Sequence, residues 1–213
     1  LSRLSRLSLF LTNDHSRQFS CITRDNPLFI VTSYHPTMAN LLTTDQLRQV
    51  LVLTLSPDAQ RRKQGEDELN RASRVTGHAL VVLELLASDA VDLSVRQSAA
   101  VHFKNLVKKG WNSDSDAEDL IALTQEQRQK IRTHLVELMC VLPPAIQKQC
   151  SASIALMAAS DYPDQWQSLL PDLVQRMASN DFKVVNGCLS TADSIFRSFR
   201  DVEWNDALDA KLQ

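Results

Sequence analysis

Glycine is scarce in this sequence, which contains only four glycines in 213 residues. Strands joined by tight turns use glycine often, whereas long helices with short connections do not. Leucine, alanine, glutamine and lysine, which favour helices, are plentiful. Hydrophobic residues make up 44% of the chain and charged residues 23%, so most of it has the composition of a folded protein. We therefore predict an all-α fold.

The chain also lacks closely spaced cysteines, a strong charge of one sign and a long apolar run. Its four cysteines, with no C-x-x-C pair among them, are Cys21, Cys140, Cys150 and Cys188. The last three lie among apolar residues, which predicts buried, reduced thiols in the cytosol or nucleus. The formal net charge of −2 does not favour nucleic-acid binding. Without an apolar run that could span a bilayer, no membrane insertion is expected.

Motifs of catalysis and metal binding are absent from the sequence. It contains no G-x-S-x-G, P-loop, G-x-G-x-x-G or H-E-x-x-H pattern. The acidic segment Asp114–Glu118 is spaced like the start of an EF-hand, but Asp119 replaces the required glycine and Gln125 the final glutamate. His102 and His134 have no second ligand one turn later. We expect no catalytic residue, metal site or cofactor, and no enzymatic activity.

Residues 1–37 differ from the rest of the sequence. This segment is rich in Ser, Arg and Thr, has only Asp14 and Asp25 as acids, and shows no sustained helical period. One interpretation is an upstream or leader-like extension without a fold; the other is an Arg/Ser-rich transit peptide. The first is favoured, because the following sequence does not resemble an organelle enzyme. Residues 38–213 are the predicted folded region.

Helix-start and helix-stop signals divide this folded region. Thr or Ser followed three residues later by Gln predicts a capping box, and proline interrupts a helix. Capping boxes are expected at Thr43/Gln46, Ser94/Gln97 and Thr124/Gln127, a helix start at Ser56-Pro57, and breaks at Pro143-Pro144 and Pro163.

These signals give eight expected helices in four pairs. Their ranges are 44–55, 57–73, 77–88, 95–110, 125–142, 144–160, 165–178 and 181–200. Pairs recur about every 40 residues, which is typical of a HEAT-repeat α-solenoid. Residues 201–213 resemble the start of a ninth helix, with Trp204 and Leu208 one turn apart. We therefore expect a fifth repeat to begin here, in a longer parent protein.

Two segments resemble the N-terminal region of the importin-β (karyopherin-β) family. The first is Arg62-x-x-Gly65-Glu66-x-x-Leu69, where the family usually has alanine in place of Gly65; that change should weaken helix propensity by about 1 kcal/mol. The second is the helix 95–110 and its end, with Phe103, Lys104-Asn105 and Trp111 in the family's spacing.

The later sequence resembles the exportin branch of this family that returns importin-α to the cytoplasm. The similarity includes residues 131–143 and the segment Asp161-Tyr162-Pro163-Asp164-Gln165-Trp166. Trp111 and Trp166 are interpreted as packing anchors, and Asp161 as a cap for the next helix.

The resemblance implies a nuclear transport receptor that shuttles between nucleus and cytoplasm. Its expected partners are Ran-GTP, importin-α as cargo, and the phenylalanine-glycine repeat proteins of the nuclear pore. Another importin-β-family importer or exporter, or a HEAT-repeat scaffold without Ran dependence, remains an alternative.

One helix face is a candidate for Ran binding. On the helix 95–110, Gln97, Lys104, Asn105 and Lys108 share one side, while the apolar residues occupy the other. An ordinary solvated face with lysines near the helix C-terminus is the alternative interpretation.

Overall fold

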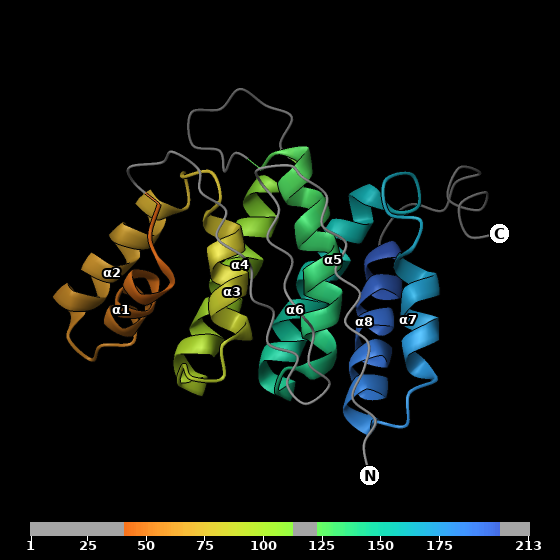
Figure 1. Cartoon of the computed structure of the whole chain (residues 1–213). Helices are drawn as coiled ribbons and strands as arrows, with labels where there is room; N and C mark the ends of the chain where they lie inside the picture. Colours follow the sequence, from red (N-terminus) through yellow and green to blue (C-terminus); the bar gives the residue numbers. More distant parts are fainter. Residues whose placement is uncertain (1–40, 113–122, 201–213) are drawn as a thin grey trace, which may run out of the picture. The chain divides into compact units, whose positions relative to one another are not determined.

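The computed structural model describes residues 41–112 and 123–200, which belong to one unit of the chain, Thr37–Gln213. These residues form helices and no strand, which confirms the all-α prediction (Figure 1). The helices are α1 (Thr44–Thr54), α2 (Ala59–Ala72), α3 (His78–Ala87), α4 (Leu93–Gly110), α5 (Gln125–Val141), α6 (Pro144–Asp161), α7 (Leu169–Met177) and α8 (Phe182–Arg200). Predictions about residues 1–37, the acidic segment 114–119 and the helix at 201–213 lie outside the described residues.

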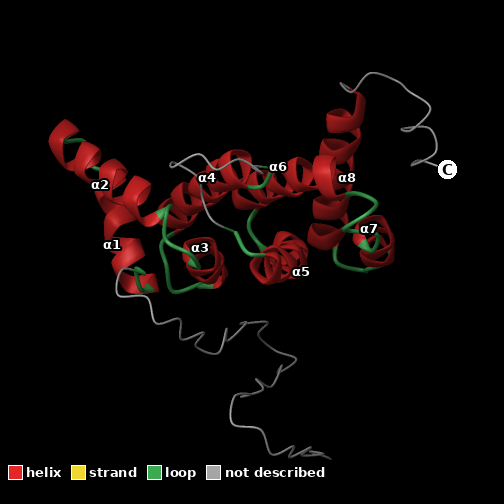
Figure 2. Cartoon of the chain, turned by 90° about the horizontal axis from the view of Figure 1, so that it is seen from above, coloured by secondary structure: helices red, strands yellow, loops and turns green. Residues whose placement is uncertain are grey.

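The helices pack as consecutive pairs arranged in two rows. Each of α1, α3, α5 and α7 packs on the helix that follows it. Figure 2 shows α3, α5 and α7 in one row and α4, α6 and α8 in the other. Helix α4 packs on α6 and α6 on α8, both more extensively than α3 packs on α5. The row α4–α6–α8 is thus the more tightly packed layer, as expected of the inner layer of a curved repeat stack.

Helix α2 pairs with α1 but does not continue the row α4–α6–α8. It packs on α1, and α1 in turn packs on both α3 and α4. The contact with α1 uses Gly65, Leu69 and Ala72, which are the buried residues of α2. A Cβ atom on Gly65 would lie 2.9 Å from the backbone nitrogen of Thr54. The absence of a side chain at Gly65 therefore permits the close approach of α1 and α2.

A continuous apolar core runs between the two rows. Its largest fully buried side chains are Trp111, Phe103, Leu47, Leu51, Leu85, Leu86, Ile131, Leu135, Met139, Ile146, Ile154 and Met157. The predicted burial of Cys140, Cys150 and Cys188 is confirmed, and all three are free thiols. Burial raises the pKa of Cys150 and of Cys188 to about 12, so both stay protonated near neutral pH.

Two of the three predicted capping boxes are confirmed. The hydroxyl of Thr43 accepts a hydrogen bond from the backbone N–H of Gln46 at 3.3 Å, and the Gln46 side chain accepts one from the Thr43 backbone at 2.9 Å. Thr124 and Gln127 form the same reciprocal pair at the start of α5. Both helices therefore begin where the sequence predicts.

The other two helix-start predictions are wrong. Helix α4 begins at Leu93 with Asp92 as its N-cap residue, so Ser94 lies already inside the first turn and cannot cap it. The N-cap of α2 is Asp58, whose carboxylate accepts from the backbone N–H of Arg61 at 2.8 Å. Ser56 instead accepts from the backbone N–H of Asp58. The Asp58 carboxylate thus caps α2 in place of Ser56, whereas Asp92 makes no side-chain capping hydrogen bond at the start of α4.

Within residues 41–112 and 123–200, no helix is both long and apolar enough to cross a membrane. The same residues hold no group of three or more His, Cys, Asp or Glu side chains placed to bind a metal ion.

Candidate protein-binding site on α4

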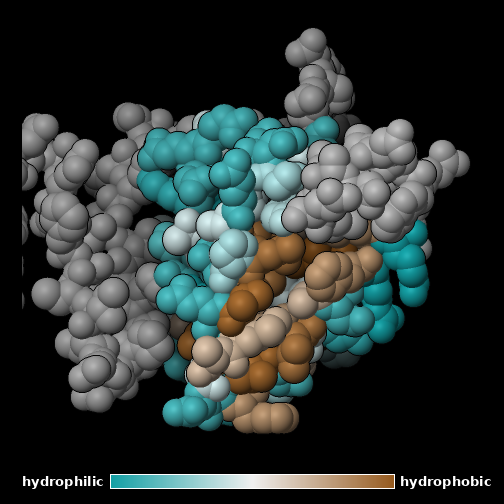
Figure 3. All heavy atoms as spheres, turned by 90° about the vertical axis from the view of Figure 1, so that its right-hand side faces the viewer, coloured by the Kyte–Doolittle hydropathy of each residue, from teal (hydrophilic) through white to brown (hydrophobic). Residues whose placement is uncertain are grey.

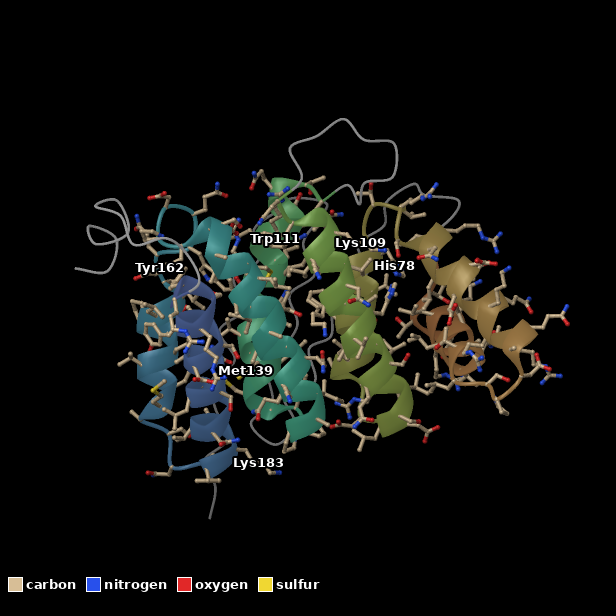
Figure 4. The ribbon with its side chains drawn as sticks, turned by 180° about the vertical axis from the view of Figure 1, so that it is seen from behind. His78, Lys109, Trp111, Met139, Tyr162 and Lys183 are labelled. Atoms are coloured by element: carbon tan, nitrogen blue, oxygen red, sulfur yellow. The ribbon has the colours of Figure 1, made fainter. Side chains whose placement is uncertain are left out.

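Helix α4 has one buried side and one accessible side. The buried side consists of Val95, Arg96, Ala99, Ala100, Phe103, Leu106, Val107 and Gly110. On the accessible side, Asn105 and Lys108 are exposed, and Gln97 and Lys104 are half-buried. The structure therefore places all four candidate residues together on one face, which we call the α4 face. Figure 4 shows α4, α6 and α8 side by side in front, so α4 is part of the layer that these helices form.

The α4 face is electropositive. The sequence of α4 contains no Asp or Glu, and Lys108 and Lys109 lie in its last turn. Within the described residues, neither Lys104 nor Lys108 forms an ion pair, and Asn105 makes no side-chain hydrogen bond. Their donors are thus free of partners in this part of the chain and can meet carboxylates or carbonyl groups of another protein.

An apolar residue that the sequence pattern did not single out lies in the middle of the α4 face. Val101 lies one turn from both Gln97 and Asn105, and 42% of its surface is exposed. The sequence contains a signal for this position, because a residue four positions from each of two polar candidates shares their side of a helix. On α6, the neighbouring helix, Lys148 is exposed while Ala152 and Leu156 are half-buried. A partner on this layer would therefore meet cations and short apolar side chains together.

The C-terminal end of α4 is fixed by Trp111. This side chain is 1% exposed, and its indole nitrogen Nε1 donates to Asp161 Oδ2 at 3.0 Å. The guanidinium carbons of Arg128 and Arg132 lie 5.6 and 5.9 Å from the centre of the Trp111 ring, within the range of cation–π attraction. Figure 4 shows Trp111 at the end of α4, next to α6.

The prediction that Asp161 caps the next helix is wrong. Asp161 is the last residue of α6 and is 3% exposed, and α7 begins after Ser168. Its carboxylate accepts from Trp111 and lies 3.4 Å from Arg132 Nε. A buried carboxylate needs such partners. Asp161 therefore joins α4, α5 and α6, and so fixes the direction in which the α4 face points.

The remaining motif residues are distributed over two regions. Leu69 is buried against α1, whereas Glu66 is exposed, and Arg62 donates to the backbone oxygen of Ser56 at 3.1 Å. These residues lie on α2, away from the α4–α6 contact. Trp166 is buried at 6% exposure in the connection between α6 and α7 that contains Pro163. The structure thus gives Leu69 and Trp166 roles in packing and Arg62 a local backbone contact.

A histidine pair lies beside the α4 face. His102 Nε2 of α4 is 2.9 Å from Nε2 of His78, the first residue of α3. Burial, with a smaller contribution from the neighbouring imidazole, lowers the pKa of His78 to about 3. Burial and the nearby Lys109 ammonium lower the pKa of His102 to about 4. Both rings are therefore neutral at physiological pH, and one donates to the other.

Comparison with known proteins gives consistent matches to one family. Residues 65–141 match the family described as Importin-beta N-terminal domain. Exportin-2 of Homo sapiens is 36% identical over 162 residues, which are 76% of this chain and 16% of that protein. The Importin-alpha re-exporter of Schizosaccharomyces pombe is 33% identical over 170 residues, covering 79% of this chain and 17% of that protein.

A solved structure shows the same fold. It is described as the exportin Cse1 in its cargo-free, cytoplasmic state, and it matches with a TM-score of 0.69 and 30% sequence identity. The match covers 79% of this chain and 18% of that one. The chain thus spans less than a fifth of the length of these relatives.

Proposed function

Because this chain belongs to the importin-β family and matches its exportin-2 members, we propose that it is the N-terminal part of a nuclear export receptor that binds Ran-GTP and exports importin-α. Residues 38–213 would be its first HEAT repeats, four helix pairs and the start of a fifth, preceded by an extension at 1–37. The protein would act by binding and not by catalysis. It would shuttle between nucleus and cytoplasm through contacts with phenylalanine-glycine repeat proteins of the pore.

The α4 face is the observation that supports this proposal most directly. It presents Gln97, Lys104, Asn105 and Lys108 on the more tightly packed layer of the repeat stack, and within the described residues Lys104 and Lys108 have no ion-pair partner. A GTPase surface with exposed carboxylates and backbone carbonyls would provide the acceptors that these donors lack. Val101 would add an apolar contact in the middle of that interface.

Nucleotide-dependent binding tests the proposal. The chain is immobilised and exposed to Ran loaded with GTP or with GDP, and the retained Ran is quantified. We expect retention of the GTP form only, because the two nucleotide states present different switch surfaces. Equal retention of both forms, or of neither, would favour a HEAT-repeat scaffold without Ran dependence.

Importin-α separates the export receptor from other members of the family. In the presence of Ran-GTP, added importin-α should be retained with the chain, and Ran-GTP retention should rise in return, because linked binding is reciprocal. Retention of Ran-GTP that is unchanged by importin-α would point to a receptor with a different cargo.

A further inference from the structure

Two buried thiols lie together where α5 packs on α8. Cys140 of α5 and Cys188 of α8 are 3% and 0% exposed, and their side chains lie within hydrogen-bonding reach of each other. Arg176, a half-buried residue in the last turn of α7, also hydrogen-bonds to the Cys140 sulfur. Helices of the third and fourth pairs thus bring two thiols and one cation together, and we call these three residues the thiol cluster.

The surroundings make the two thiols unequal. Cys140 donates its own proton to the backbone oxygen of Val136 at 3.3 Å, so its sulfur can accept from Cys188 and Arg176. Burial raises the pKa of both thiols. Arg176 and Cys188 counteract this rise in the pKa of Cys140, whereas Cys140 raises the pKa of Cys188 further. Of the two thiols, Cys140 therefore loses its proton more readily.

Cys150 provides a comparison within the same chain. It lies on α6 and is 1% exposed, so it is buried as deeply as the other two thiols. In the part of the chain that the structure describes, burial raises the pKa of Cys150, and neither a cation nor a second thiol contributes to the shift. Cys150 therefore shares the burial of the thiol cluster but lacks its neighbouring groups.

We propose that Cys140 and Cys188 are a site of reversible oxidation by hydrogen peroxide, which joins them in a disulfide between α5 and α8. The Cys140 thiolate attacks one peroxide oxygen and breaks the O–O bond, which gives a sulfenic acid on Cys140 and releases one water once the leaving hydroxide is protonated. The Cys188 sulfur then attacks Cys140 Sγ, the S–O bond breaks, and the hydroxide leaves as a second water with the Cys188 proton. The two thiols lose two electrons, which reduce the peroxide.

The disulfide would join two helix pairs at a junction with few other contacts in the outer row. Helix α3 packs on α5 in that row, but within the described residues α5 and α7 have no comparable contact. The third and fourth pairs are held together by the packing of α5 and of α6 on α8. A covalent bond between α5 and α8 would therefore limit bending between these pairs.

The packing around the cluster limits how fast an oxidant can reach it. Figure 3 views the stack from the end where α7 and α8 lie and shows side chains packed closely over this surface, including an apolar band. Because Cys188 has no exposed surface, the peroxide reaches the thiols only when this packing opens locally. Oxidation should therefore be slow. In a reducing compartment the disulfide would be transient.

Peptide mapping without reduction tests the proposal. The folded full chain is treated with hydrogen peroxide, the remaining thiols are alkylated, and linked peptides are quantified by mass spectrometry. The Cys140–Cys188 linkage should form, disappear on addition of dithiothreitol, and exceed any linkage of Cys150 or Cys21 at least about tenfold. The proposal is overturned if both thiols stay reduced, if each is oxidised separately to a sulfinic acid, or if they are linked mainly to other cysteines or to a second chain.

Two further measurements distinguish a native pair from random cross-linking. Arg176→Gln removes the cation and should slow formation of the linkage at least about threefold, whereas Gln175→Ala, at an exposed position of α7, should leave the rate unchanged. The oxidised chain should unfold at a urea concentration about 1 M higher than the reduced chain, and peroxide should cause no such shift in Cys188→Ser. An unchanged rate in Arg176→Gln, or an oxidised chain no more stable than the reduced one, would contradict the proposal.

Discussion

At the scale of single residues, the carboxylate of Asp161 connects three helices. It is the only buried acid among the described residues, and it contacts Trp111 of the α4 end and Arg132 of α5. Ser160 also donates to its second oxygen, Oδ1, at 3.0 Å. Because Trp111 ends α4, this cluster determines how the α4 face is oriented relative to α6.

Removing this carboxylate should be costly. In Asp161→Ala, the buried guanidinium of Arg132 loses its counter-ion and Trp111 its acceptor, so the free energy of unfolding should fall by about 3–5 kcal/mol. Asp193→Ala is the control, because Asp193 pairs with Arg197 at 2.9 Å on an exposed surface; its loss should be below about 1 kcal/mol. Urea unfolding followed by circular dichroism measures both. Similar small losses in the two variants would show that the Asp161 cluster does not stabilise the fold.

The histidine pair makes stability depend on pH. The pKa values of His78 and His102 are lowered to about 3 and about 4 in the folded chain, while histidines in the unfolded chain titrate near 6.5. The unfolded state therefore takes up protons first as pH falls. The contribution of the pair is fully present above about pH 6.5 and is lost progressively as pH falls towards 4.

The variant His102→Gln isolates this effect. Its free energy of unfolding should decrease less steeply than that of the unmodified chain between pH 6.5 and about 5, where carboxylates hardly titrate. Thermal or urea unfolding at several pH values gives the two slopes. Parallel slopes would mean that the pair is not held neutral by burial.

The residues of these clusters could not be assigned from the sequence. Trp111 and Asp161 are fifty positions apart, and nothing in either local segment indicates that they meet. An Asp near an expected helix start fits a cap equally well, so the local pattern pointed to the wrong role. Val101 could not be identified for a related reason. A single apolar residue on a polar helix face indicates a contact surface only when its exposure is known.

At the scale of helices, local chemistry determines most boundaries. Seven of the eight helices both begin and end within two residues of the predicted positions. The capping boxes at Thr43 and Thr124 and the Pro143-Pro144 break contribute to this agreement, because each acts within a single turn. The exception is α7, which was expected from residue 165 and begins at Leu169. The backbone N–H groups of Gln165 and Trp166 instead donate to the backbone carbonyl oxygen of Asp161. Tertiary burial of Trp166 therefore overrides the local helix signal.

The contact between α1 and α2 depends on Gly65. Gly65→Ala should raise intrinsic helix propensity by about 1 kcal/mol, but the added Cβ would lie 2.9 Å from the Thr54 backbone nitrogen. Backbone atoms cannot move aside as a flexible side chain can, so overpacking at about 1–3 kcal/mol should prevail and destabilise the chain. The expectation that Gly65 only weakens helix propensity leaves this contact out.

Comparison with Gln64→Ala in the same helix checks this prediction. Gln64 is exposed, so its substitution should change the free energy of unfolding by no more than about 0.5 kcal/mol. The midpoint of urea unfolding is measured for both variants. A Gly65→Ala chain that is as stable as Gln64→Ala, or more stable, would contradict the close approach of α1 and α2.

At the scale of the whole described region, the paired helices place the polar side of α4 on the layer formed with α6 and α8. The 40-residue period predicts such stacking, because a single pair cannot bury its apolar face. The period does not predict that α1, and not α2, is the helix of the first pair that packs on α4. In that arrangement α1 and α2 approach closely at Gly65, a contact that has no signature in the hydrophobic pattern.

The most direct measurement of the central claim is the affinity of the full chain for Ran-GTP with and without the cations of the α4 face. By titration calorimetry, Lys104→Glu/Lys108→Glu should bind at least about tenfold more weakly at unchanged helicity. Arg61→Glu/Lys63→Glu reverses two exposed charges on α2 and should bind as tightly as the unmodified chain. If the α4 variant keeps the full affinity, or if both variants lose it equally, the α4 face is not the Ran-binding surface.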